Sequence, residues 1–190
     1  MWTVNGGTDG CSAAATTVEL RRSADGLVWG PPAPVQIGGN GESPWHIDVE
    51  WIPSRSEYWA VFNAKTPGTC MTRVVRFATS PDAVTWAVYP YPLLRAGAIP
   101  AFADVVYRAS IAYDAASDLA TILYSGARAT DGVYVWQIAT EQIGLKSLMS
   151  RVTASATPAT PSARIMVQGT RPATRPATRT APELTNETAP

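Results

Sequence analysis

The stretch Pro44-Trp-His-Ile-Asp-Val-Glu-Trp51 has a counterpart, Pro100-Ala-Phe-Ala-Asp-Val-Val-Tyr107, that lies 56 residues further along the chain. A second pair of similar stretches, Ser23–Trp29 and Ser80–Trp86, is separated by 57 residues. Two independent pairs with nearly the same spacing indicate an internal repeat of about 57 residues. This repeat decides the predicted fold, because each unit must then form the same small structure.

Each predicted unit consists of short runs rich in Val, Ile, Tyr and Trp, separated by Gly, Pro, Asn and Asp. Such runs are typical of strands in an antiparallel all-β domain. A repeated four-stranded unit of this length is typical of a β-propeller blade. A β-sandwich is the alternative, but it gives no reason for the period. The strands predicted in one full unit are His46–Ile52, Tyr58–Asn63, Arg73–Thr79 and Thr85–Leu94.

The fold class predicted for residues 1–147 is all-β, with antiparallel four-stranded blades of an incomplete β-propeller. The blades are expected at about 1–38, 44–95 and 100–147, and the first of them lacks its innermost strand. Propellers close with typically four to eight blades, whereas this chain provides about two and a half to three. We therefore expect a fragment whose missing blades complete the ring. A ring completed by a second chain is the alternative.

Residues 148–190 differ in composition from the rest of the chain. The last aromatic residue is Trp136, and the segment from Ser150 onward is rich in Thr, Ala and Pro. It includes the repeat Arg171-Pro-Ala-Thr-Arg-Pro-Ala-Thr-Arg179. Such a composition buries too little apolar surface to offset the entropy of ordering. The sequence therefore predicts a low-complexity, disordered tail at 148–190.

The charges of the whole chain balance, with 15 basic and 15 acidic side chains. Proteins that bind nucleic acid or an anionic membrane surface through their charge need an excess of Lys and Arg. No apolar run approaches the roughly 20 residues of a transmembrane helix. We therefore expect neither nucleic acid nor a membrane as a partner, and the start of the chain does not resemble a signal peptide.

The two Ser-x-Asp-x-x-x-Trp stretches are expected to be structural turns. Their Ser and Asp side chains can bond to backbone groups of the turn while the Trp packs over it. Ala83 stands where the first copy has Gly26, which predicts a different turn conformation because glycine accepts a positive φ without penalty. The six turn residues are Ser23, Asp25, Trp29, Ser80, Asp82 and Trp86.

Two aspartates, Asp48 and Asp104, occupy matching positions of the repeat. On the predicted layout both lie on innermost strands, where a carboxylate is costly unless it faces the axial cavity or finds partners. Cleavage of a glycosidic bond needs two flanking carboxyl groups, roughly 5–9.5 Å apart. Asp48 and Asp104 are therefore the candidate catalytic pair. The alternative is that both accept hydrogen bonds from backbone amides and hold the blades in register.

Further candidates lie where the innermost strands begin and where second strands lead into third strands. Trp45 can stack on a sugar ring or pack in the core. Arg108 can bind a substrate group or pair with an acid on the next blade. His46, the only histidine, can bond substrate or transfer a proton, although its counterpart Phe102 favours packing. The candidate substrate-binding residues are Trp45, His46, Asn63, Lys65, Arg108, Ser125 and Arg128.

Cys11 and Cys70 follow the second strands of successive units at comparable places. They are candidates for a disulfide between adjacent blades, which would imply an oxidising compartment. Two unpaired structural thiols are the alternative. The sequence contains no Cys/His cluster for zinc, no phosphate-binding glycine loop and no serine-nucleophile elbow. We therefore expect no cofactor and no metal.

The chain from Trp2 to Trp136 resembles the five-bladed propellers of the arabinanase, xylosidase and invertase-like glycoside hydrolases. Its Ser-x-Asp turns resemble the Asp-box of sialidases. The stretches that carry the resemblance are Trp45–Val49, Tyr58–Asn63, Ala78–Asp82, Tyr107–Ser110 and Leu123–Arg128.

The resemblance implies an Asp base or nucleophile, a second Asp and a Glu acid, each from the inner region of a different blade. Asp48 and Asp104 match two of these positions, and the missing blades would have to supply the Glu. We therefore expect a glycoside hydrolase-like propeller that acts on or binds a carbohydrate chain, as a fragment without the full catalytic set. The parent protein would be an extracellular or periplasmic enzyme. The alternative is a non-catalytic propeller module that binds a glycan or a protein.

Overall fold

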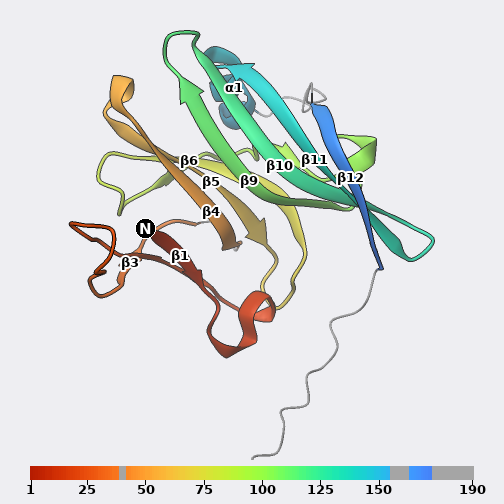
Figure 1. Cartoon of the computed structure of the whole chain (residues 1–190), viewed down its shortest axis with the longest axis horizontal. Helices are drawn as coiled ribbons and strands as arrows, with labels where there is room; N and C mark the ends of the chain where they lie inside the picture. Colours follow the sequence, from red (N-terminus) through yellow and green to blue (C-terminus); the bar gives the residue numbers. More distant parts are fainter. Residues whose placement is uncertain (39–41, 155–162, 173–190) are drawn as a thin grey trace, which may run out of the picture.

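The computed structural model describes residues 1–38, 42–154 and 163–172, which form three antiparallel sheets (Figure 1). The first sheet has three short strands in the order β1-β2-β3. A 3-10 helix, η1 (Gly7–Ser12), connects β1 to β2. The strands of this sheet are β1 (Trp2–Asn5), β2 (Thr17–Leu20) and β3 (Ala33–Val35).

The second sheet contains the full unit that the repeat predicted. Its order is β4-β5-β6-β7, and β8 also pairs with β6. The predicted fourth strand, Thr85–Leu94, is divided into two short pieces, because Pro90 and Pro92 cannot donate to the ladder. A 3-10 helix, η2 (Pro53–Arg55), forms the turn after β4. The strands are β4 (Ser43–Ile52), β5 (Glu57–Lys65), β6 (Thr72–Ser80), β7 (Ala87–Val88) and β8 (Leu94–Arg95).

The third sheet has four strands in the order β12-β11-β10-β9. A 3-10 helix, η3 (Pro100–Phe102), precedes it, and α1 (Leu145–Thr153) connects β11 to β12. Among the described residues no helix is long and apolar enough to cross a bilayer. The strands are β9 (Val105–Asp114), β10 (Leu119–Thr130), β11 (Val133–Gly144) and β12 (Arg164–Pro172).

The fold is mostly antiparallel β-sheet with few helices, which confirms the all-β class. Among the described strands, the first sheet has none at the place where the other two sheets have β4 and β9. The described sheets do not close into a ring, so a propeller is not shown (Figure 1).

The structure differs from the disordered tail that the composition predicted from residue 148 onward. Helix α1 buries Leu148 and Val152 in the core of the third sheet. Strand β12 pairs with β11 through its backbone, and this pairing does not need aromatic side chains. The remaining parts of the predicted tail, 155–162 and 173–190, lie outside the described residues.

The second sheet is buried on both faces. Successive residues of a strand point to opposite sides, so β5 divides its side chains between two cores. Trp59 packs with Phe77 and Ile122 in a core shared with the third sheet. Phe62 packs with Val18 in a core shared with the first sheet. Two-sided burial therefore fixes the positions of both neighbouring sheets.

A buried ion pair holds α1 against the third sheet. Arg151 donates two hydrogen bonds to Glu141, at 2.8 and 3.0 Å, and the Glu141 side chain is only 3% exposed. Arg151→Met leaves this carboxylate buried and unpaired, so we expect the free energy of unfolding to fall by about 3 kcal/mol in urea denaturation. Lys146→Met, at an exposed position of α1, is the control and should change it by less than about 0.5 kcal/mol. Equal losses in both variants would contradict this role of the pair.

Candidate functional site

Two backbone bulges lie at matching places in β4 and β9. His46 and Arg108 each lie six residues before the end of their strand, and each is left out of the pairing register with the neighbouring strand. Both have a positive φ, 56° for His46 and 42° for Arg108. Such a conformation is uncommon for residues other than glycine and is found often at functional sites. A bulge also redirects side chains, so the two strands present His46 and Arg108 in a way that regular strands would not.

A row of aromatic rings connects the two bulges. The His46 ring lies 5.3 Å from the ring of Trp45 and 4.7 Å from the ring of Tyr107, measured between centroids. Tyr107 lies 5.8 Å from Trp136, which in turn lies 6.2 Å from Tyr134. All five side chains are half-buried. We call Trp45, His46, Tyr107, Arg108 and Trp136 the bulge site.

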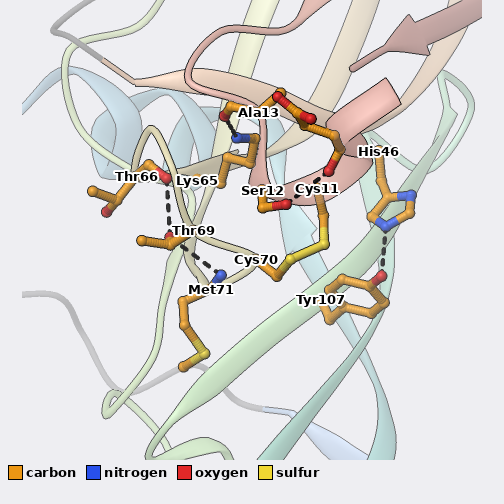
Figure 2. Close-up of a disulfide and its surroundings, with 11 residues drawn as sticks. Cys11, Ser12, Ala13, His46, Lys65, Thr66, Thr69, Cys70, Met71 and Tyr107 are labelled. Carbon is orange, nitrogen blue, oxygen red and sulfur yellow. Dashed lines mark hydrogen bonds between the residues drawn. A yellow bond between two sulfur atoms is a disulfide. The ribbon is translucent and has the colours of Figure 1, made fainter. Parts of the chain in front are cut away.

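His46 and Tyr107 connect the second and third sheets within the bulge site. The Nε2 atom of His46 and the hydroxyl oxygen of Tyr107 share a hydrogen bond of 2.7 Å, drawn in Figure 2. Burial, together with the positive charge of Arg108, lowers the pKa of His46 to about 4. The imidazole is therefore neutral at neutral pH. The Arg108 guanidinium is exposed and lies 5.7 Å from the centroid of the Tyr107 ring, in a cation–π contact.

A cleft of about 250 Å³ opens beside Trp45 and His46. Its other walls are Ile47 on β4 and the side chains of Trp2 and Val4 on β1. The cleft therefore has an apolar side along β1 and a polar side at the bulge site. No group of three or more His, Cys, Asp or Glu side chains that could hold a metal ion occurs among the described residues.

Asp48 contacts the edge of the third sheet. Its Oδ2 atom accepts a hydrogen bond of 3.0 Å from the backbone N–H of Ile111 on β9. Glu50, on the same face of β4, lies near the backbone N–H of Tyr113, and burial raises the pKa of its carboxyl. β9 is the edge strand of its sheet. The two carboxylates therefore face backbone groups that are not paired with another described strand.

Asp104 makes a different contact at the other end of β9. Its carboxylate accepts a hydrogen bond of 2.7 Å from the N–H of Ala129 on β10. The residue that Asp48 contacts, Ile111, lies about 23 Å further along the chain at ~3.3 Å per residue. The structure therefore does not bring Asp48 and Asp104 together around one glycosidic bond. Counted from the ends of the two strands, the counterpart of Asp48 is Ser110, so the predicted equivalence of the two aspartates is also corrected.

Three of the predicted substrate-binding residues instead bond to the protein itself. Asn63 is fully buried and donates to the carbonyl of Val106 at 3.1 Å, which ties the second sheet to the third. Ser125 donates to the carbonyl of Tyr107 at 2.7 Å. Lys65 is 1% exposed and donates to the carbonyl of Ala13, and burial lowers its pKa. Arg128 is exposed near the end of β10.

Cys11 and Cys70 form a disulfide that joins η1 to the segment after β5 (Figure 2). Lys65 and its bond to Ala13 lie beside it in the same view. The disulfide and the lysine together fasten the first sheet to the second.

The two Ser-x-Asp turns have the same geometry. Asp25 accepts hydrogen bonds from the two backbone N–H groups that follow Gly26, and Asp82 does the same after Ala83. These bonds lower the pKa of both carboxyls. Ala83 has φ 66° and Gly26 has φ 75°, so the expected difference in turn conformation is wrong. Trp86 is buried over its turn, whereas its counterpart Trp29 is exposed.

Sequence reasoning found Trp45, His46 and Arg108 but missed Tyr107, Trp136 and the cleft wall at Trp2. A signal was present, because an aromatic residue precedes a basic one in both Trp45-His46 and Tyr107-Arg108. The spacing of this pair differs from the repeat that the other stretches suggested. The correspondence of the two pairs appears only when the residues of β4 and β9 are numbered back from the hairpin at the end of each strand.

Removal of the Asp48 carboxylate should loosen the contact between the second and third sheets. Asp48→Ala leaves the N–H of Ile111 without its acceptor, and we expect the free energy of unfolding to fall by about 1–3 kcal/mol. Asp48→Asn keeps an acceptor oxygen and should lose less. Urea denaturation checks both variants, and an Asn variant that is as unstable as the Ala variant would contradict the hydrogen-bond account.

Removal of the disulfide should have a larger effect. The bridge closes a loop with a sequence separation of 59 residues. Cys11→Ser combined with Cys70→Ser is expected to lower the free energy of unfolding by about 4 kcal/mol, from the entropy that the unfolded chain regains. Thermal melting of the oxidised protein with and without a reductant gives the matching measurement. An unchanged melting temperature after complete reduction would contradict this expectation.

No family model matches the chain. A curated relative, the A type blood N-acetyl-alpha-D-galactosamine deacetylase of Flavonifractor plautii, is 32% identical over an alignment of 126 residues, and the match covers 62% of this chain and 16% of the relative. The chain is thus homologous to a carbohydrate-active deacetylase over these residues. The glycoside hydrolase resemblance expected from the motifs is not confirmed.

A solved structure shows the same fold. It is the crystal structure of an N-acetylgalactosamine deacetylase from F. plautii in complex with blood group B trisaccharide, with a TM-score of 0.67 and 24% identity. The match covers 80% of this chain and 48% of the solved chain. The chain therefore spans about half the length of the structure it matches, and a smaller part of the curated relative.

Proposed function

We propose that this chain is part of a protein that acts on a carbohydrate and that the bulge site binds the sugar. The observation that carries the proposal is the His46–Tyr107 hydrogen bond, which joins two sheets within a row of half-buried aromatic rings next to a cleft. The homologous relative is named for an activity on N-acetyl-alpha-D-galactosamine, which supports the carbohydrate as the ligand class.

The chemistry of the bulge site suits a sugar. Half-buried Trp and Tyr rings offer flat apolar surfaces to the C–H faces of a pyranose. Ligand sites combine such apolar walls with a few fixed polar groups. Here Arg108 supplies several N–H donors, and the neutral imidazole of His46 is held in place by Tyr107.

We infer that His46 positions the ligand rather than transferring protons. A general base works best when its pKa lies near the operating pH, and the pKa of His46, about 4, lies well below that value. We propose deacetylation of an amino sugar as the activity of the whole protein, by homology, with the reacting groups outside the bulge site.

Glycoside hydrolysis is the second candidate activity, and it would need carboxyl groups other than the separated Asp48 and Asp104. A non-catalytic binding module is favoured over it by one observation, namely that both aspartates accept backbone hydrogen bonds.

We also propose that the three sheets are blades of a propeller, with boundaries near those predicted. Repetition of similar antiparallel sheets that pack face to face supports this architecture. The disulfide supports an oxidising compartment, in keeping with an extracellular or periplasmic location.

Sugar binding can be tested with the full chain and free N-acetylgalactosamine by isothermal titration calorimetry. Trp45→Ala removes one ring of the aromatic row, and we expect it to weaken binding about tenfold, since loss of a stacked aromatic contact costs about 1.4 kcal/mol. Trp51→Ala is the matched control, because Trp51 is also on β4, is 44% exposed and packs on Tyr58 away from the bulge site. Its affinity should be unchanged.

Equal weakening in both variants, at unchanged melting temperature, would contradict the bulge site as the binding surface. Absence of binding to N-acetylgalactosamine and to galactose alike would contradict the proposed ligand class for this chain.

A further inference from the structure

The edge of β1 that faces away from β2 has no strand beside it among the described strands. In each of the other two sheets, a strand pairs at the matching edge. β4 pairs with β5 and β9 pairs with β10, whereas β1 ends the first sheet with β2 as its only paired neighbour among the described strands. Met1 and Arg21 exchange two backbone hydrogen bonds, at 3.0 and 2.9 Å. Because such pairs alternate along an antiparallel ladder, the N–H and C=O groups of Trp2 and Val4 point away from β2, toward the free edge.

The surroundings of this edge are apolar and open. Trp2 and Val4 line the cleft of about 250 Å³ together with Ile47 on β4. β1 also contacts β4, and the two strands are drawn near each other in Figure 1. A strand that lies beside β1 would therefore pair with the free backbone groups and cover the apolar side of the cleft.

A second observation lies on β4. On β9 the N–H of Ile111, three residues before the end of the strand, donates to the carboxylate of Asp48 on the preceding sheet. The matching residue of β4 is Val49, and the hairpin registers of the two strands agree, so its N–H also points to a free edge. No carboxylate accepts from Val49 within the described part of the chain, although its counterpart has one.

We propose that the free edge of β1 binds an extended polypeptide strand from outside these 190 residues, and that this strand carries an acidic side chain that accepts from the N–H of Val49. The bound strand pairs with β1 at the edge of the first sheet, as β4 pairs with β5 at the edge of the second. Its alternate residues carry Asp or Glu toward β4, as Asp48 and Glu50 of β4 face β9. The inference stands apart from the proposed sugar site, which uses the opposite side of the cleft.

The chain itself provides a probe, the fluorescein-labelled peptide with the sequence of Ser43–Ile52, which is the corresponding strand of the second sheet. We expect it to bind the full chain in fluorescence anisotropy. A control peptide with alanine at both acidic positions should bind at least fivefold more weakly, because it has no acceptor for Val49.

Variants of Val4 test the edge itself. Val4→Pro removes a backbone N–H that points away from β2, and proline is tolerated in an edge strand. We expect it to weaken peptide binding at least tenfold, whereas Val4→Thr, which keeps the N–H, should stay within twofold. Thermal melting shows whether each variant is folded.

Three results would overturn the proposal. One is equal binding of both peptides, and another is undiminished binding to a folded Val4→Pro variant. The third is a dimer in sedimentation that Val4→Pro dissolves, because a second copy would then occupy the edge. Sugar titration is a separate measurement, so failure of the peptide test leaves the sugar proposal unaffected.

Discussion

The contact between the carboxylates of β4 and the free edge of β9 is the constraint on which the rest of the structure depends. An edge strand presents unpaired N–H groups, and burying them without partners costs free energy. Asp48 supplies an acceptor for Ile111 from the neighbouring sheet. This contact sets the position of β9 along β4, and it thereby brings the two bulges together. In this register His46 and Tyr107 share a hydrogen bond.

The positions of several strands could be predicted from the sequence, because runs rich in Val, Ile, Tyr and Trp between Gly, Pro, Asn and Asp are typical of strands. β4, β5 and β6 lie close to the predicted runs for this reason. Composition was a weaker guide at the C-terminal end. It describes how much apolar surface a segment can bury, but β12 is held by backbone pairing with β11.

The residues of the site could be predicted only in part, because the chemistry of a side chain does not show which partner lies opposite it. Lys65 and Asn63 have the character of ligand-binding residues, yet both bond to backbone carbonyls in the interior. The pairing of Asp48 with Asp104 followed the similarity of two short stretches. Counted from the ends of β4 and β9, matching residues lie 62 positions apart (114 − 52) instead of 56, and the pattern of apolar residues does not show this difference.

The interaction that ties β4 to β9 is not repeated by β9 itself. The counterpart of Asp48 on β9 is Ser110, and the residue that matches Trp59, which packs against the third sheet, is Thr121 on β10. At these two matching positions the outer face of the third sheet therefore has neither the carboxylate nor the large aromatic side chain that β4 and β5 present to the third sheet. The first sheet shows the reverse, with an apolar inner side and a free edge. The two ends of the row of sheets therefore differ. The first sheet has a free edge that a further strand could pair with, whereas the third sheet does not present the carboxylate and aromatic side chain that β4 and β5 present.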